Sequence, residues 1–298
     1  MAKVHASYYT DPVCPWSWAM EPALRGLQRE FGEGIEWTFV MGGLAREIED
    51  DPRRIVEWLE AGDQGAMPVD PRIWAGGPAS RPRSSYPACI AVKAAAEQGD
   101  PARYLRRLRE GLLARRRKLD TTEALIEEAR AVPEMDVERF RIDLASNWTV
   151  ERFGADLERA SEAGERAGAG ATTATAGERR PAAGATAPAL IPGGERGSRV
   201  QLPSVEFVAP GGEPHGVYGF TDLAVLRSTA VAAGAEPLRA PAFGVEDALT
   251  RLGALATSEV AAVCDLPGPR AAAELWRLAL EWRVRAERVL TGELWTVA

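Results

Sequence analysis

The stretch DPVCPWSWAMEP, residues 11–22, marks the point where a predicted strand gives way to a helix. The segment before it, 4–10, is β-branched and aromatic, as strands are. Pro15 suits the first turn of a helix, because its missing N–H would be unpaired there, and apolar residues follow at helical spacing. We therefore expect Cys14 to lie at a helix N-terminus, with the helix kinked at Pro22.

A second alternating segment, 35–43, completes a β-α-β unit and predicts parallel strands. From 45 to 166, apolar residues recur three or four positions apart between Pro, Gly and acidic breaks, which indicates a helical insertion. Residues 167–199 are rich in Ala, Gly, Thr and Pro and have little to bury, which predicts a flexible linker. Strand signals return at 200–220, and a helix is predicted at 221–233.

Residues 236–298 follow the predicted α/β core and are not needed to complete it. They are predicted to form three helices and a hairpin, an order that resembles a winged-helix module. Glutamates offset the arginines of this module, so we expect it to bind a protein partner or form a homodimer, not to bind nucleic acid. The predicted domains are an α/β core of 1–44 and 200–235, a helical insertion of 45–166, a linker of 167–199 and a winged-helix-like module of 236–298.

The overall composition limits the classes of function. The net charge of −7 argues against nucleic acid as the general partner of the chain. No apolar run has the length of a membrane-spanning helix or of a signal peptide, so we expect a cytoplasmic protein without membrane contact. The three cysteines lie far apart in the sequence, which suits a reducing compartment. With two isolated histidines and no paired-cysteine motif, no metal site is predicted.

Three short motifs in this order of elements resemble the thioredoxin-like proteins of the DsbA family. The motifs are CPWS at 14–17, SSYPACIAVKAA at 84–95 and LPS at 202–204. The most similar branch includes cytoplasmic dithiol-disulfide isomerase-like proteins, 2-hydroxychromene-2-carboxylate isomerases and kappa-class glutathione transferases. The resemblance implies a thioredoxin fold with a large helical insertion. It also implies a cis peptide bond before Pro203 that lies close to Cys14.

The CPWS motif differs from the active-site motif of the dithiol members and from that of the isomerases and transferases. Dithiol members carry a second cysteine where this chain has Ser17, and the isomerases and transferases carry serine where it has Cys14. A thiol at a helix N-terminus is expected to have a lowered pKa and to be nucleophilic. Ser17 can donate a hydrogen bond to the thiolate but cannot expel a bound substrate. The candidate catalytic residues are Cys14 and Ser17, and the candidate substrate-binding residues are Pro15, Trp16, Ser85, Cys89, Leu202 and Pro203.

Several functions fit this motif. The leading hypothesis is a thiol-disulfide oxidoreductase in which Cys14 acts alone and an external thiol, or Cys89, resolves the intermediate. A transferase or isomerase that depends on a thiol such as glutathione is a second hypothesis, and a non-catalytic adaptor for a protein partner is a third. No tightly bound cofactor is expected. Both cysteines could instead be inert core residues.

A basic stretch, RYLRRLREGLLARRRK at 103–118, holds eight cations and one acid. Its leucines fall on one stripe, so the charged residues are expected to form a solvated face. Docking of an anion is the alternative interpretation.

Overall fold

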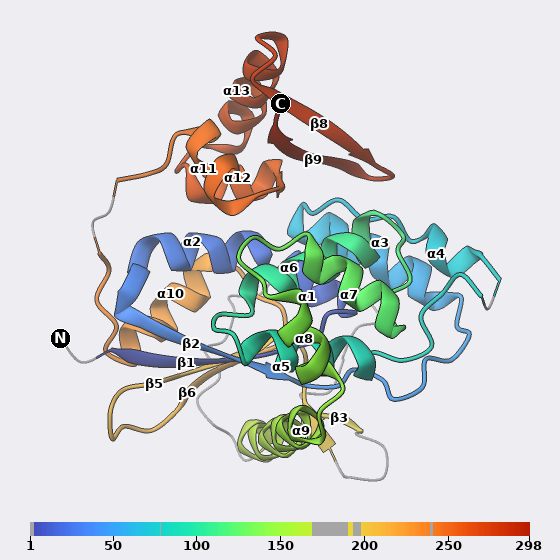
Figure 1. Ribbon diagram of the computed structural model, residues 1–298. Helices are drawn as coiled ribbons and strands as arrows, with labels where there is room; N and C mark the ends of the chain where they lie inside the picture. Colours follow the sequence, from blue (N-terminus) through green and yellow to red (C-terminus); the bar gives the residue numbers. More distant parts are fainter. Residues whose placement is uncertain (1–2, 78, 169–189, 193–197, 239–240) are drawn as a thin grey trace.

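A four-stranded sheet forms the centre of the protein (Figure 1). Its strands lie in the order β2-β1-β5-β6. Strand β1 (Val4–Thr10) is parallel to β2 (Ile35–Met41) and antiparallel to β5 (Ser204–Val208), and β5 is antiparallel to β6 (His215–Tyr218). The computed structural model describes residues 3–77, 79–168, 190–192, 198–238 and 241–298.

Helices cover both faces of this sheet. On one face, α2 (Glu21–Phe31) and α10 (Leu223–Ala232) pack against apolar side chains of β1, β5 and β6. On the other face lies α9 (Asn147–Gly168), as Figure 1 shows. This arrangement covers both surfaces of β1, and six of its seven residues are buried.

Pro22 does not kink a single helix. The structure has two helices here, α1 (Pro15–Ala19) and α2, and Pro22 lies in the first turn of α2. A proline is tolerated in a first turn because the N–H it lacks has no partner within the helix. The predicted kink is therefore a break between two helices.

The described residues of 45–166, the predicted helical insertion, are mostly helical. A short 3₁₀ turn (Gly32–Gly34) precedes β2, and a π-helical turn (Glu110–Ala114) follows α6. Within the described residues no helix is long and apolar enough to cross a membrane. Before α9, the helices are α3 (Arg53–Gly65), α4 (Arg72–Ala75), α5 (Tyr86–Ala96), α6 (Ala102–Arg109), α7 (Thr122–Arg130) and α8 (Val137–Leu144).

Parts of the predicted linker belong to ordered elements. Helix α9 extends to Gly168, and β3 (Leu190–Pro192) pairs with β4 (Ser198–Val200). The remainder of the linker prediction, residues 169–189 and 193–197, lies outside the described residues.

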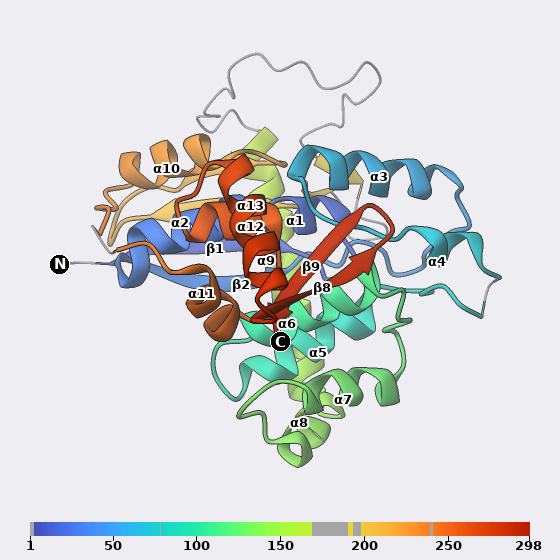
Figure 2. The ribbon, with the colours of Figure 1, turned by 90° about the horizontal axis from the view of Figure 1, so that it is seen from above.

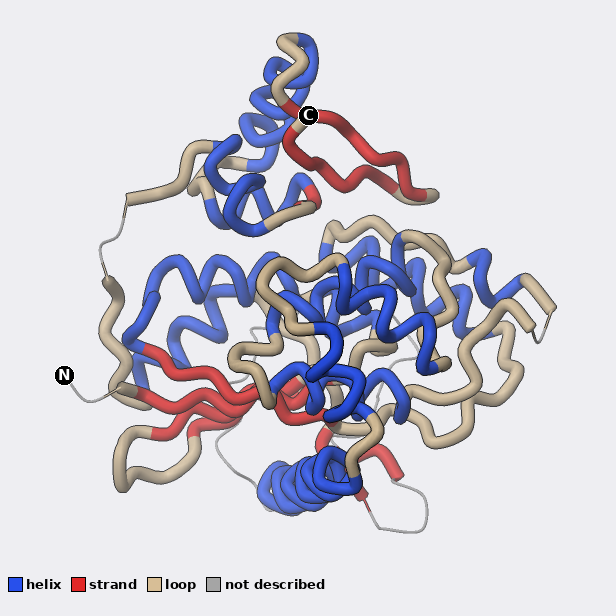
Figure 3. The backbone as a smooth tube through the Cα atoms, in the orientation of Figure 1, coloured by secondary structure: helices blue, strands red, loops and turns tan. Residues whose placement is uncertain are grey.

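The C-terminal module has its own core and its own sheet. Its helices enclose a cluster of apolar side chains that includes Trp295, and its strands lie in the order β7-β9-β8. Figure 3 shows the hairpin of this sheet apart from the central strands. The elements are α11 (Val245–Leu252), β7 (Leu255–Ala256), α12 (Thr257–Val263), α13 (Gly268–Leu280), β8 (Val284–Val289) and β9 (Gly292–Val297).

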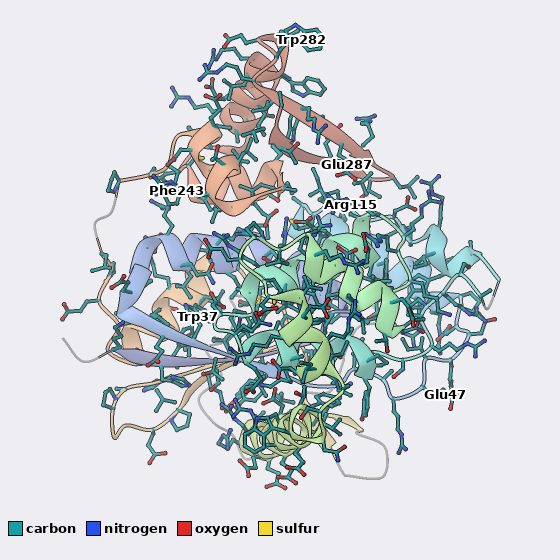
Figure 4. All side chains as sticks on the ribbon, in the orientation of Figure 1. Trp37, Glu47, Arg115, Phe243, Trp282 and Glu287 are labelled. Carbon is teal, nitrogen blue, oxygen red and sulfur yellow. The ribbon has the colours of Figure 1, made fainter. Side chains whose placement is uncertain are left out.

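The module lies on top of the sheet and the helical insertion. Figure 2 shows α12 over α2, with the β8–β9 hairpin extending across α6. The hairpin turn contacts the loop after α3, where Thr291 Oγ1 accepts a hydrogen bond from Val69 N at 2.8 Å. Arg115 forms hydrogen bonds of 2.8 Å to both carboxylate oxygens of Glu287, on β8 (Figure 4).

A buried cluster of charges joins the three parts of the chain. Glu259 of α12 is fully buried and accepts hydrogen bonds from Arg25 Nε at 2.6 Å and from Arg106 Nη2 at 2.8 Å. Arg109 donates to Glu21 and Thr10. The expected solvated face is therefore wrong for Arg106 and Arg109, because both guanidinium groups find carboxylates that lie far away in the sequence.

Removing the carboxylate of Glu259 tests this cluster. Glu259→Ala leaves Arg25 and Arg106 without a shared anion, so we expect it to reduce the free energy of unfolding by about 3–5 kcal/mol. The measurement is urea-induced unfolding followed by circular dichroism. Glu127→Ala is the control, because its ion pair with Arg130 is exposed and should contribute less than about 1 kcal/mol. Equal losses in the two variants would contradict the structural role of Glu259.

Candidate functional site

Cys14 lies where the first strand of the sheet meets α1. It is the N-cap of α1, and its Sγ accepts a hydrogen bond from Ser17 N at 3.4 Å. The same Sγ donates to Leu202 O at 3.7 Å, although 188 positions separate the two residues. The Leu202–Pro203 peptide bond is cis. The fold thus brings together the two motifs that the resemblance placed side by side.

The expectation of a lowered pKa for Cys14 is wrong. Cys14 is only 2% exposed, and burial raises the pKa of its thiol to about 11. Interactions with Ser17 lower this pKa by less, and the carboxylates of Asp11 and Glu57 raise it further. Helix α1 has only five residues, so few peptide dipoles align behind the thiol. The thiol is therefore protonated at neutral pH.

Helix α9 and strand β4 account for much of this burial. Cys14 belongs to a cluster of buried apolar residues that includes Ala160 and Ala163 of α9 and Val200 of β4. A polar contact holds α9 against the sheet, because Arg166 donates hydrogen bonds to both carboxylate oxygens of Glu206, at 3.0 and 2.9 Å.

Two tyrosines complete the site around Glu206. Tyr9 donates to Glu206 Oε2 at 2.7 Å, and Tyr218 donates to Oε1 at 2.9 Å. Burial raises the pKa of the Glu206 carboxyl, but the hydrogen bonds from Arg166, Tyr9 and Tyr218 outweigh it, so the net shift is downward. Glu206 is therefore an anion at neutral pH, and its contact with Arg166 persists.

Asp11 is a second buried acidic group near Cys14, and burial raises the pKa of its carboxyl. Its carboxylate accepts hydrogen bonds from Val13 N at 2.8 Å, Leu44 N at 2.6 Å and Cys89 Sγ at 3.2 Å. Burial and the neighbouring Asp11 raise the pKa of the Cys89 thiol well above its usual range. Cys89 is thus a fully buried core residue whose thiol proton is bonded to Asp11.

The other candidate residues differ in their accessibility. Ser85 is fully buried, and its hydroxyl accepts a hydrogen bond from Ala45 N at 3.1 Å, which fixes the loop after β2. Pro15 and Pro203 are buried as well. Trp16 is partly exposed and packs against Phe220 with ring centroids 5.6 Å apart. Among the substrate-binding candidates, Trp16 is therefore the side chain that an incoming molecule can reach without a rearrangement.

The hydroxyl of Ser17 is also enclosed. Ser17 is fully buried, and its Oγ has no hydrogen-bond partner among the described residues. Its backbone N–H, rather than this hydroxyl, donates to Cys14 Sγ. In the described part of the chain, no three His, Cys, Asp or Glu side chains gather as metal ligands.

The sequence analysis missed Arg199 as a neighbour of the site. Arg199 belongs to β4, within the segment predicted as linker, and its Nη2 donates to Leu44 O at 2.8 Å. Burial lowers the pKa of this guanidinium group, against opposing contributions from Asp11 and Cys14. One arginine in an Ala- and Gly-rich stretch carries no local signal. The glycine-free segment that begins at Ser198 was the available hint.

Comparison with known proteins places the chain in a family. Residues 8–166, more than half of the chain, match the thioredoxin family. The chain belongs to this family, and its fold is that of the DsbA-type members, in which helices are inserted into the thioredoxin core.

Three curated relatives are named as ClpXP adapter proteins, not as oxidoreductases. A ClpXP adapter protein SpxH from Halalkalibacterium halodurans is 31% identical over 168 residues, which cover 52% of this chain and 53% of that protein. Its counterpart from Bacillus subtilis is 26% identical over 160 residues, so these matches span about half the length of either relative. The SpxH of Shouchella clausii is 26% identical over 309 aligned residues, covering 99% of this chain and 89% of that protein.

Two solved structures share the fold. A candidate protein disulfide isomerase from Nitrosomonas europaea has a TM-score of 0.56 at 14% identity, covering 77% of this chain and 97% of the other. A candidate DsbA oxidoreductase from Streptomyces coelicolor has a TM-score of 0.52 at 16% identity, covering 80% of this chain and 94% of the other. At such low identity, these likenesses describe the fold alone.

The raised pKa of Cys14 should appear in the stability of the protein at alkaline pH. A folded pKa of about 11 exceeds that of an exposed thiol, so this contribution to stability is complete below pH ~9 and is lost as the pH rises towards 11. Between these values we expect the wild type to lose up to about 3 kcal/mol more than Cys14→Ser. Urea unfolding at several pH values measures the difference. Parallel pH profiles for the two proteins would show that Cys14 has an ordinary pKa.

The contact between Arg166 and Glu206 should control access to Cys14. Arg166→Ala removes the two hydrogen bonds that hold α9 against β5, so we expect at least about tenfold faster alkylation of Cys14 by iodoacetamide. Peptide mass spectrometry separates Cys14 from Cys89 and Cys264. Arg152→Ala is the control on the same helix, because Arg152 is half exposed and its contacts, 3.9 Å to Glu97 and 5.7 Å to the ring centroid of Trp148, do not involve the sheet. Unchanged alkylation in Arg166→Ala would refute this role.

Proposed function

We propose that this protein is a thioredoxin-like adaptor that binds a protein partner and links it to ClpXP. The proposal draws on the relatives named as ClpXP adapters, one of which aligns with 99% of this chain. The thioredoxin core then serves as a scaffold, and the C-terminal module supplies a binding surface for another protein.

Uncovered apolar side chains on the C-terminal module are the observation that carries this proposal. Trp276, Leu280 and Trp282 are 51%, 81% and 87% exposed. Trp276 packs edge-on against the buried Trp295, with ring centroids 5.0 Å apart, so it is held in place before any partner arrives. Large apolar residues gathered on a surface are typical of protein-binding sites, and tryptophan is enriched among the residues that dominate binding energy.

The position of Trp282 adds to this surface. It follows the last residues of α13 and has a positive φ of 60°, an uncommon conformation for a bulky residue. Figure 4 shows its side chain at the outer end of the module, away from the sheet. Leu280 lies one helical turn after Trp276, so the two side chains fall on the same face of α13.

The arginines of the module favour a protein over nucleic acid as the partner. Arg277 pairs with Glu274 and Glu281, and Arg283 pairs with Glu246. These carboxylates neutralise the positive charge next to the apolar surface. A nucleic-acid site requires an uncompensated basic stripe, because phosphate contacts dominate its affinity.

The state of Cys14 agrees with a role that does not require thiol chemistry. Thiol-disulfide exchange requires a thiolate, and both burial and a raised pKa disfavour it here. Monothiol exchange completed by an external thiol, such as glutathione, is the competing proposal. It is motivated by the cis-proline loop beside Cys14 and requires α9 to move first. A thiol-dependent transferase or isomerase would need the same opening.

Protein turnover in the host cell tests the adaptor proposal. Deletion of the gene should lengthen the half-lives of a small set of ClpXP substrates, measured by pulse-labelled proteomics. Leu280→Glu should lengthen them as the deletion does, because it places a charge in the apolar surface. Val231→Glu is the matched control, since Val231 is also exposed but lies on α10.

Cys14→Ser distinguishes the two proposals. An adaptor should restore normal half-lives when it carries this substitution, whereas a monothiol enzyme should lose its activity completely. Normal turnover with Leu280→Glu, together with failure of Cys14→Ser, would replace the adaptor proposal by the redox one.

A further inference from the structure

A cavity of about 990 Å³ lies between the thioredoxin core, the helical insertion and the C-terminal module. Its walls come from α2, β2, α6, the end of α11 and strand β8. Neither Cys14 nor Pro203 lines it, so it is separate from the site around the thiol. A volume of this size is at the upper end of the range for small-molecule sites.

The walls of this cavity carry more cations than anions. Eight arginines line it, against four acidic residues. Most of these arginines are already engaged with carboxylates, as Arg25 and Arg106 are with Glu259, and Arg115 is with Glu287. These pairs fix the shape of the walls and leave little charge for a ligand.

Two arginines of the cavity remain uncompensated. Arg103, on α6, is exposed and makes no hydrogen bond or ion pair with any residue that the structure describes. Arg285, on β8, is also exposed and donates to Thr296 Oγ1 at 3.1 Å, but it pairs with no carboxylate in the described part of the chain. The helical insertion and the C-terminal module thus each contribute one guanidinium group without a direct ion pair among the described residues.

Among the described contacts, two acids of the lining form no ion pair with these arginines. Glu287 pairs with Arg115, whose hydrogen bond lowers the pKa of the carboxyl, and the charges of Arg107 and Arg285 lower it further. Asp100, another acid of the lining, accepts a hydrogen bond from Ala102 N at 2.9 Å and forms no ion pair with Arg103 among the described contacts. An anion entering here would therefore meet two guanidinium groups that have no direct ion pair in the described part of the chain.

A different part of the lining is apolar. Trp37 and Phe39 of β2 and Leu24 of α2 lie on the wall that the thioredoxin core supplies. Leu24 is buried, and the two aromatic rings are partly exposed. Most small-molecule sites combine such a wall with a few polar groups that orient the ligand.

We propose that this cavity binds a small organic anion that carries phosphate or carboxylate groups. Arg103 and Arg285 hold the anionic groups, because a guanidinium group donates two parallel hydrogen bonds to such an oxyanion. The side chains of Trp37 and Phe39 contact the uncharged part of the ligand. A bound anion would bridge the helical insertion and the C-terminal module and stabilise their contact in proportion to its affinity. This proposal does not depend on the adaptor function.

Titration with three probes tests the proposal. Inorganic pyrophosphate, citrate and ADP are each added to the full-length protein, and binding is followed by isothermal titration calorimetry and by tryptophan fluorescence. We expect saturable binding of at least one probe at millimolar concentration or below. Stronger binding of pyrophosphate or ADP than of citrate would identify phosphate as the preferred group, and the reverse order would identify carboxylate.

Arginine substitutions locate the bound anion. Arg103→Ala and Arg285→Ala should each weaken binding at least about tenfold, which corresponds to about 1.4 kcal/mol. Both side chains are exposed, so the fold should persist, and circular dichroism verifies it. Arg270→Ala is the control, because Arg270 is an exposed arginine of the same module that does not line the cavity.

Three outcomes would overturn the proposal. The first is the absence of saturable binding for all three probes. The second is an equal effect of Arg270→Ala and Arg285→Ala, which would indicate unspecific attraction to surface charge. The third is binding of an acidic peptide with no binding of any small anion, which would identify the cavity as a protein contact.

Discussion

The arrangement of the thioredoxin core, the helical insertion and the C-terminal module depends on the ion pairs of the Glu259 carboxylate. Glu259 is fully buried and forms ion pairs with Arg25 of the thioredoxin core and Arg106 of the helical insertion. Buried charges are tolerated only when each has its partner, since an unpaired one is costly to remove from water. These ion pairs therefore favour the observed position of the C-terminal module, which also forms one wall of the arginine-lined cavity.

The same cluster reaches the helix that begins at Cys14. The guanidinium carbon of Arg106 lies 4.3 Å from the ring centroid of Trp18, and Trp18 Nε1 donates to Pro68 O at 3.0 Å. Gly292 of the hairpin lies next to this same Pro68, since a Cβ on Gly292 would be 3.4 Å from Pro68 Cβ. Helix α1 is thus fixed from the side of the C-terminal module, while α9 packs with Cys14 from the side of the sheet. The thiol is enclosed by parts of the chain that are far apart in sequence.

Local patterns were enough to predict the frame of the fold. β-Branched and aromatic residues predicted the strand at 4–10, and proline placement predicted the start of α1. The resemblance of CPWS and LPS placed Cys14 beside Leu202. The properties of the site were less predictable. A helix N-terminus lowers the pKa of a thiol only where burial is modest, and the burial of Cys14 depends on α9, whose position no local pattern reveals.

The basic stretch at 103–118 also shows that local patterns do not reveal burial by distant residues. Charged residues at helical spacing predict a solvated face, yet Arg106 and Arg109 are buried, because they pair with Glu259 and Glu21. Neither acid lies near them in the sequence. The sequence analysis missed Arg199 because the linker prediction for 167–199 rests on average composition, which gives no information about one residue beside the site.

The enclosure of Cys14 also determines how the protein responds to oxidants. With a pKa of about 11, only about one thiol in ten thousand is ionised at pH 7. Peroxides and disulfides react with the thiolate, so this cysteine is oxidised far more slowly than the exposed, acidic thiol of a redox sensor. A thioredoxin fold is commonly associated with redox exchange. Here the thiol at the start of the first helix is shielded from oxidants by the side chains that pack around it.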